Sequence, residues 1–330
     1  MPGADRWFGP VFPVAVKLSV PAGMMEVMTS TADNTSATPP PRLGVAFVPV
    51  VPPERLRSLV VAAEQSGLDD FWVWEDCFKE SGVASAAAAL AWTERIRVGI
   101  GLMPAPLRNV ALTAMEIATL ERMFPGRLLP GVGHGVQDWM GQVGNRAASP
   151  LTLLREYSTA LRRLLHGEKV TVEGKYVNLT DVQLDWPPAT PPKLYVGGEG
   201  PKTLKLTGEV GDGSMLSWAG SDEELGSRVQ LVLEAARSKP GGAAGHEISV
   251  GQIAATGPDA QARVDAELPI WGRRPGPGNG IAGDAEAIAA DVRRLGALGC
   301  STVILQATSD EPDIEGFIRF LGQEVRPLLG

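Results

Sequence analysis

The 330-residue sequence is poor in the features that define several large protein classes. Its two cysteines, Cys77 and Cys300, lie far apart and in no metal-binding spacing, which excludes a disulfide framework and favours a reducing, cytoplasmic compartment. Long hydrophobic runs are missing too, so no membrane association is expected. Basic residues are scattered and the formal net charge is −8, which argues against nucleic acid as a partner.

Histidine is equally scarce. The three present, His134, His166 and His246, show no metal-ligand spacing, so no metal site is expected. No Ser/Cys–His–Asp pattern or nucleophile elbow accompanies them. His166 is expected to end a helix, and His246 lies in a glycine-rich loop.

Residues 1–41 differ in composition from the rest of the chain. They are rich in Pro, Ser and Thr and show no periodicity, which predicts a disordered N-terminal extension. The segment lacks the continuous apolar core of a signal peptide. The true start could be Met1, Met24, Met25 or Met28, and the sequence does not decide between them.

From residue 42 to 330, short apolar runs alternate with helical periodicity. The expected strands are 42–50, 68–76, 95–103, 127–132, 193–198, 213–218, 247–256 and 301–307. The expected helices are 52–67, 81–93, 109–124, 149–167, 201–210, 221–238, 258–268, 284–299 and 313–329. This rhythm predicts the α/β class, as one (β/α)₈ TIM-barrel domain; a doubly wound open sheet is the alternative. Residues 169–184 alternate with period two and predict a β-hairpin insertion after the fourth helix.

Two glycine clusters follow expected strands. They are GVGHG at 131–135 and GGEG at 197–200, the second running into a helix that opens with Pro201. Glycine lets the backbone approach a ligand, and a helix N-terminus offers free N–H groups to a phosphate. Each cluster alone could be a tight turn, but two at one barrel rim favour a cofactor site. Neither matches a dinucleotide fingerprint or a P-loop.

Two adjacent carboxylates, Glu75 and Asp76, end the second expected strand. Neighbours in a strand point to opposite faces, so at most one of them faces the barrel mouth. A helix-capping or solvated pair is as good an explanation as a catalytic one.

Two longer stretches carry a resemblance to a known family. TERIRVGIGLMPAPLRN…TAMEIATLERMFPGRLLPGVGHG resembles the third and fourth units of luciferase-like oxidoreductases. PPKLYVGGEGPKTLKLTGEVGDGSML resembles their fifth and sixth units, nearest to the branch of methylene-tetrahydromethanopterin reductases that use the deazaflavin coenzyme F420. The resemblance spans residues 42–329.

The resemblance implies a flat flavin or deazaflavin ring in the barrel mouth. It implies a bulge behind that ring, often with a non-prolyl cis peptide, at Gly101, Leu102 and Met103. Gly133, His134 and Gly135 would contact the ring, and Gly197, Gly198, Glu199 and Gly200 would hold the phosphate. Glu75 and Asp76 are the expected catalytic residues.

The sequence departs from the family pattern in two places. The family usually has an acid followed by histidine after strand two, where this chain has Glu75 and Asp76. Pro130 stands inside the fourth strand, where its missing N–H must cost a hydrogen bond or cause a bulge.

The expected function is hydride transfer between F420 and a small organic substrate. The alternatives are an FMN-dependent monooxygenase supplied by a separate reductase, and a barrel that binds flavin or F420 without turnover. The family is often dimeric, so a homodimer is a further expectation.

Overall fold

The computed structural model describes residues 39–217, 221–239, 242–276 and 278–330. The expected extension over residues 1–41 therefore lies almost wholly outside the described residues, and so do its candidate start residues. Pro41 precedes the first strand and is buried against Gly296, where its ring takes the space of a missing side chain.

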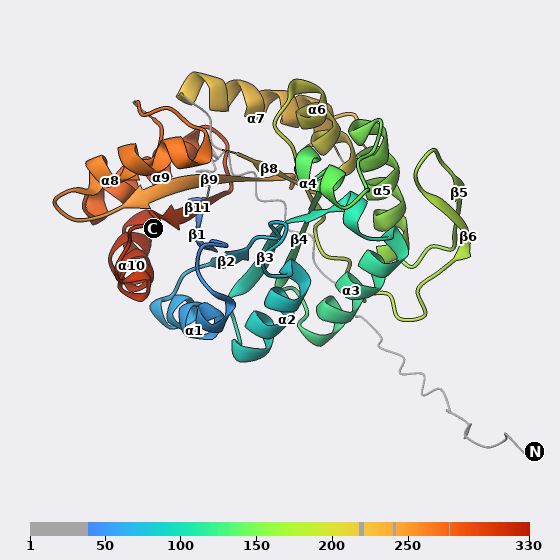
Figure 1. Ribbon diagram of the computed structural model, residues 1–330, viewed down its shortest axis with the longest axis horizontal. Helices are drawn as coiled ribbons and strands as arrows, with labels where there is room; N and C mark the ends of the chain where they lie inside the picture. Colours follow the sequence, from blue (N-terminus) through green and yellow to red (C-terminus); the bar gives the residue numbers. More distant parts are fainter. Residues whose placement is uncertain (1–38, 218–220, 240–241, 277) are drawn as a thin grey trace, which may run out of the picture. The chain divides into compact units, whose positions relative to one another are not determined.

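Eight parallel strands form a closed barrel surrounded by the connecting helices (Figure 1). The strands are β1 (Arg42–Phe47), β2 (Asp70–Val73), β3 (Arg97–Pro104), β4 (Leu128–Gly133), β7 (Tyr195–Gly197), β8 (Gly213–Leu216), β9 (Glu247–Ala255) and β11 (Thr302–Ala307). Pairing of β8 with β9 closes the circle. The strands are almost continuously buried because helices cover one face and the barrel core fills the other. The closed barrel is confirmed, and the open sheet is excluded.

The helices match the expected periodic segments to within a few residues at most of their ends. They are α1 (Leu56–Ser66), α2 (Gly82–Trp92), α3 (Val110–Met123), α5 (Pro150–Leu165), α6 (Pro201–Val210), α7 (Asp222–Ala236), α8 (Ala260–Glu267), α9 (Ala285–Ala297) and α10 (Ile314–Phe320). The last expected helix is shorter, because a π turn (Leu321–Val325) and a 3₁₀ turn (Arg326–Leu329) follow α10. Among the described residues, no helix is long and apolar enough to cross a membrane.

Several short elements of the described chain were not expected from the sequence, including the 3₁₀ turn Ala105–Leu107 after β3. The six-residue helix α4 (Gln137–Gln142) lies directly after the first glycine cluster. A 3₁₀ turn (Leu268–Trp271) and the two-residue strand β10 (Ile281–Ala282), which pairs with β9, interrupt the expected loop 269–283. The expected hairpin is present as β5 (Val170–Glu173) paired with β6 (Asn178–Val182).

A charged cluster fills the amino end of the barrel. Its members begin four strands: Asp70, Arg97, Tyr195 and Glu247. Arg97 Nε and Nη2 donate to the two oxygens of buried Asp70 at 2.6 and 2.7 Å, and the Tyr195 hydroxyl donates to Glu247. These mutually paired groups close the amino end, so the site belongs at the carboxyl ends of the strands.

Candidate active site

Strand β3 carries the expected irregularity. The peptide bond between Gly101 and Leu102 is cis, and the pairing register between β3 and β4 shifts between Ile100 and Met103. Pro130 pairs with Ile100, directly before this shift. The ladder therefore breaks beside the proline, with the bulge on β3 rather than on β4.

The side chain of Leu102 lies between two of the predicted cofactor-contacting glycines. A Cβ on Gly133 would lie 2.6 Å from Leu102 Cδ2, and a Cβ on Gly197 would lie 2.3 Å from the same atom. A Cβ on Gly101 would lie 2.5 Å from Cε of Met215, on β8. The carboxyl ends of β3, β4 and β7 thus meet around one half-buried leucine. Met103, in contrast, is 1% exposed and packs in the core.

The second glycine cluster leads into helix α6. Gly200 is the N-cap residue, with φ −72° and no side chain to bond the first N–H groups of the helix. A Cβ on Gly198 would lie 2.3 Å from Thr203 Cγ2, so the first turn of α6 itself requires a glycine there. Space around Gly200 is open, and exposed Glu199 forms an ion pair with Arg273 at 3.3 Å. The start of α6 can accept an anion.

His134 lies between the barrel and α4. Its Nδ1 lies 2.9 Å from the carbonyl oxygen of Gly135, and its own carbonyl accepts from Gln137 Nε2 at 3.1 Å. Gly135 has φ +67° and packs closely against Pro104 and Met140. Local contacts thus account for both residues, and their contact with a ring remains a prediction.

Glu75 is held as a buried, paired carboxylate. Its Oε2 accepts from the backbone N–H of Gly82 at 2.8 Å, and its two oxygens accept from the guanidinium of Arg108. Arg108 Nε also lies 3.4 Å from Glu116 Oε2. The Glu75 side chain is 8% exposed and that of Arg108 14%. This carboxylate is therefore fixed in place by charge and geometry.

Asp76 has a different environment although it is the next residue. Its pKa is raised to about 6, mainly by burial and also by the nearby Glu80, and Lys79 opposes this rise. No described residue donates a hydrogen bond to this carboxylate or forms an ion pair with it. A carboxyl group with a pKa near neutrality can both donate and accept a proton under physiological conditions.

Two buried polar atoms at other strand ends lack partners. Ser217 Oγ, after β8, and Gln306 Nε2, on β11, have no hydrogen-bond partner among the described residues. Buried polar groups are normally hydrogen-bonded, so such atoms at the carboxyl end of a barrel fit a polar ligand in the mouth.

Sequence reasoning missed Arg108 and Met215. Arg108 lies in the connection that follows β3 and is the only charged residue between Arg97 and Glu116. A single charged residue after a strand end could have marked it as a candidate site residue. Nothing in the sequence pattern distinguishes Met215 from an ordinary strand residue.

The closed barrel with converging glycine-bearing strand ends defines the class: a (β/α)₈-barrel enzyme with its site at the carboxyl ends of the strands. Residues 25–301 match the luciferase-like monooxygenase family, and the chain belongs to that family.

Individual proteins show the same relationship. The chain is 32% identical over 231 residues to 5,10-methylenetetrahydromethanopterin reductase of Methanolobus tindarius, covering 69% of each chain. It is 33% identical over 192 residues to F420-dependent glucose-6-phosphate dehydrogenase of Kineococcus radiotolerans, covering 54% of this chain and 56% of that one. The solved structure of an F420-dependent secondary alcohol dehydrogenase with an F420–acetone adduct shares the fold, with a TM-score of 0.77 and 23% identity over 88% of this chain and 99% of that one.

Proposed function

We propose that the chain transfers a hydride between coenzyme F420 and a small organic substrate. The observation that carries this proposal is the meeting of Gly133 and Gly197 around Leu102, with the uncapped start of α6 following directly after β7. A flat floor beside an anion-accepting helix end suits a ring that carries a phosphate-bearing chain. The F420-dependent relatives support the choice of cofactor.

In this proposal, different residues of the chain bind the ring and the phosphate of the cofactor. A bound deazaflavin supplies the carbon that takes or gives the hydride. Leu102 and the adjacent glycines form the surface under the ring, and the first N–H groups of α6 bind the phosphate. Ser217 and Gln306 offer a hydroxyl and an amide to polar atoms of the ring.

Asp76 carries the proton in this proposal. When the substrate is reduced, its carboxylic acid donates a proton to the heteroatom while the hydride goes to carbon; the reverse reaction returns both. Glu75 cannot readily do this, because Arg108 and Gly82 occupy its oxygens. It instead fixes the segment that carries Asp76.

Gly200→Asp tests the phosphate site without a steric clash, since nothing lies within 4 Å of a Cβ there. The new carboxylate would cap α6 itself and repel a phosphate, so F420 affinity should fall at least about tenfold. Gly200→Asn caps the helix without the charge and is the matched control. Retained absorbance after incubation with F420 or FMN measures binding. Unchanged F420 affinity in Gly200→Asp refutes the phosphate placement, and tight FMN binding without F420 binding refutes the cofactor.

A further inference from the structure

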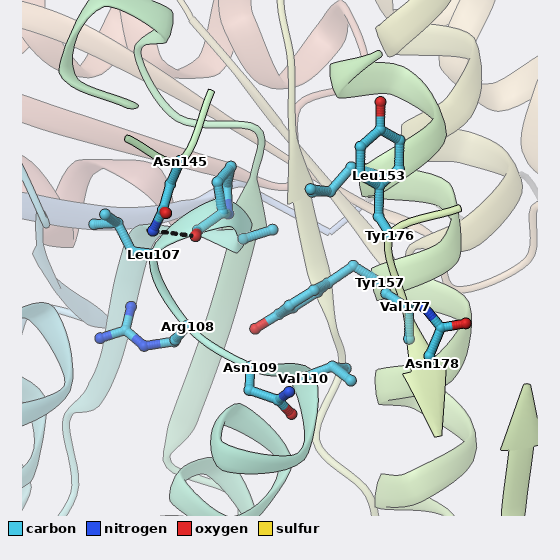
Figure 2. A pocket seen from close by; sticks show the side chains of 12 residues that line it. Leu107, Arg108, Asn109, Val110, Asn145, Leu153, Tyr157, Tyr176, Val177 and Asn178 are labelled. Carbon is cyan, nitrogen blue, oxygen red and sulfur yellow. Dashed lines mark hydrogen bonds between the residues drawn. The ribbon is translucent and has the colours of Figure 1, made fainter. Parts of the chain in front are cut away.

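A cavity of about 330 Å³ lies next to the connection that follows β3 (Figure 2). It is lined by the connection from β3 to α3, the loop before α5, the first two turns of α5 and the tip of the β5–β6 hairpin. Its volume falls within the usual range for small-molecule sites. The proposed ring and phosphate sites use other residues, so this cavity is distinct from them.

Hydrogen bonds hold the outer wall of this cavity in place. Glu156, on α5, accepts from the backbone N–H groups of residues 175–177 at 3.0, 2.8 and 3.1 Å, which ties the hairpin tip to the helix. The hydroxyl of Tyr176 accepts from the backbone N–H of Ser149 at 2.6 Å. The wall is therefore preformed, and a ligand does not have to order it.

Three asparagines line this cavity from three different segments. Asn109 Oδ1 accepts from the N–H of Ala111 at 2.9 Å, which leaves the amide NH₂ group of Asn109 available. Asn145 Nδ2 donates to the carbonyl of Pro106 at 3.0 Å, which leaves the Asn145 carbonyl oxygen available. The side chain of Asn178 has no hydrogen-bond partner among the described residues. The cavity thus offers both donors and acceptors, all of them neutral.

The charge near the cavity is already neutralised. Arg108 is the only charged residue among the described residues that line it. Figure 2 shows its guanidinium turned away from Tyr157, and that group is paired with Glu75 and Glu116. The ring of half-buried Tyr176 and the aliphatic stem of Arg108 supply apolar surface instead, and Tyr157, which is 3% exposed, adds little. An anion would find no free cation here.

We propose that this cavity binds a neutral polyhydroxylated molecule, a sugar or a polyol. Each hydroxyl group of such a ligand both donates and accepts, which matches the mixed capacity of the amides of Asn109, Asn145 and Asn178. Its C–H face can pack against the ring of Tyr176. This site uses none of the residues proposed to contact the cofactor, and its occupancy requires no cofactor.

Binding of D-glucose and of myo-inositol to the full chain without cofactor tests the proposal, with inorganic phosphate and sulfate as anionic probes. Saturation-transfer NMR and titration calorimetry report affinity. At least one neutral probe should bind saturably, and Asn178→Leu should weaken it about tenfold or more. Asn178 is exposed on β6, so its variant should fold. Thr180→Val, exposed on the same strand and outside the cavity lining, is the control and should bind as the unmodified chain does.

Three results would overturn the proposal. The first is the lack of saturable binding of both neutral probes at high millimolar concentrations. The second is tighter binding of phosphate or sulfate that Asn178→Leu weakens, because the cavity would then be an anion site. The third is neutral-probe binding that Gly200→Asp removes and Asn178→Leu leaves intact, because the probe would then lie in the barrel mouth.

Discussion

Replacing Arg108 with methionine tests whether Glu75 is a held carboxylate. Methionine keeps the apolar stem and removes the charge, which leaves Glu75 buried with only the Gly82 N–H as a partner. Removing one partner of a buried ion pair costs about 3–5 kcal/mol. Because that N–H remains, we expect the lower end, about 3 kcal/mol less free energy of unfolding for Arg108→Met.

A double-mutant cycle measures the interaction energy between Glu75 and Arg108 apart from the other effects of each substitution. Glu75→Gln keeps an acceptor for Gly82 and leaves Arg108 with Glu116, so its cost should be smaller, about 2 kcal/mol. The double variant Arg108→Met with Glu75→Gln should be more stable than Arg108→Met alone, because no unpaired carboxylate remains buried. Urea denaturation of the four proteins measures this. A loss below about 1 kcal/mol in Arg108→Met, or no recovery in the double variant, refutes the reasoning.

Three other positions give separate tests. If Asp76 donates the proton, the rate of substrate reduction should fall as pH rises through about 6. Asp76→Asn should lower kcat about 100-fold and abolish this pH dependence, and Asp76→His should partly restore both kcat and the pH dependence. A pH dependence that survives in Asp76→Asn contradicts the role. Gly197→Ala places a methyl group 2.3 Å from Leu102 and should lower the free energy of unfolding, measured by urea denaturation, by about 1–3 kcal/mol. Gly226→Ala, on α7 where a methyl group has space, should not lower it. Equal stabilities of the two variants count against the close packing at Gly197. Burial, with Lys239 and Lys193, lowers the pKa of His246 from 6.5 to about 4. Between these pH values the unfolded chain binds more protons than the folded chain, so the free energy of unfolding should fall by up to about 3 kcal/mol as pH drops from about 6.5 to 4. The same pH dependence of stability in His246→Gln contradicts this.

The barrel could be predicted from sequence because its strands are buried on both faces. Such strands are short apolar runs between helical segments, and the pattern resolves them well. Helix α4 was missed because it has six residues and follows glycine-rich sequence with no capping side chain at Val136. The turn at Leu268–Trp271 and strand β10 lie in a segment where proline and glycine suggest only loop. Their formation depends on tertiary contacts, such as pairing with β9.

The sequence places the candidate site residues at strand ends but does not show their contacts. Glycines after parallel strands indicate a close backbone approach at the rim. The sequence cannot show that Gly133 and Gly197 both make room for Leu102, because the contacts join strands 31 and 95 residues apart along the chain. The pairing of Arg108 with Glu75 is equally long-range, and no periodicity encodes it.

The proposed proton transfer rests on the different environments of the adjacent carboxylates Glu75 and Asp76. The family pattern has histidine after the acid, and an ordinary histidine titrates near 6.5. An ordinary aspartate is fully ionised at that pH and a poor proton donor. Burial moves the pKa of Asp76 to about 6, within reach of the imidazole value. Arg108 draws the other carboxylate, Glu75, into an ion pair, so the two acids have separate roles. The environment therefore brings the pKa of this aspartate close to that of an ordinary histidine.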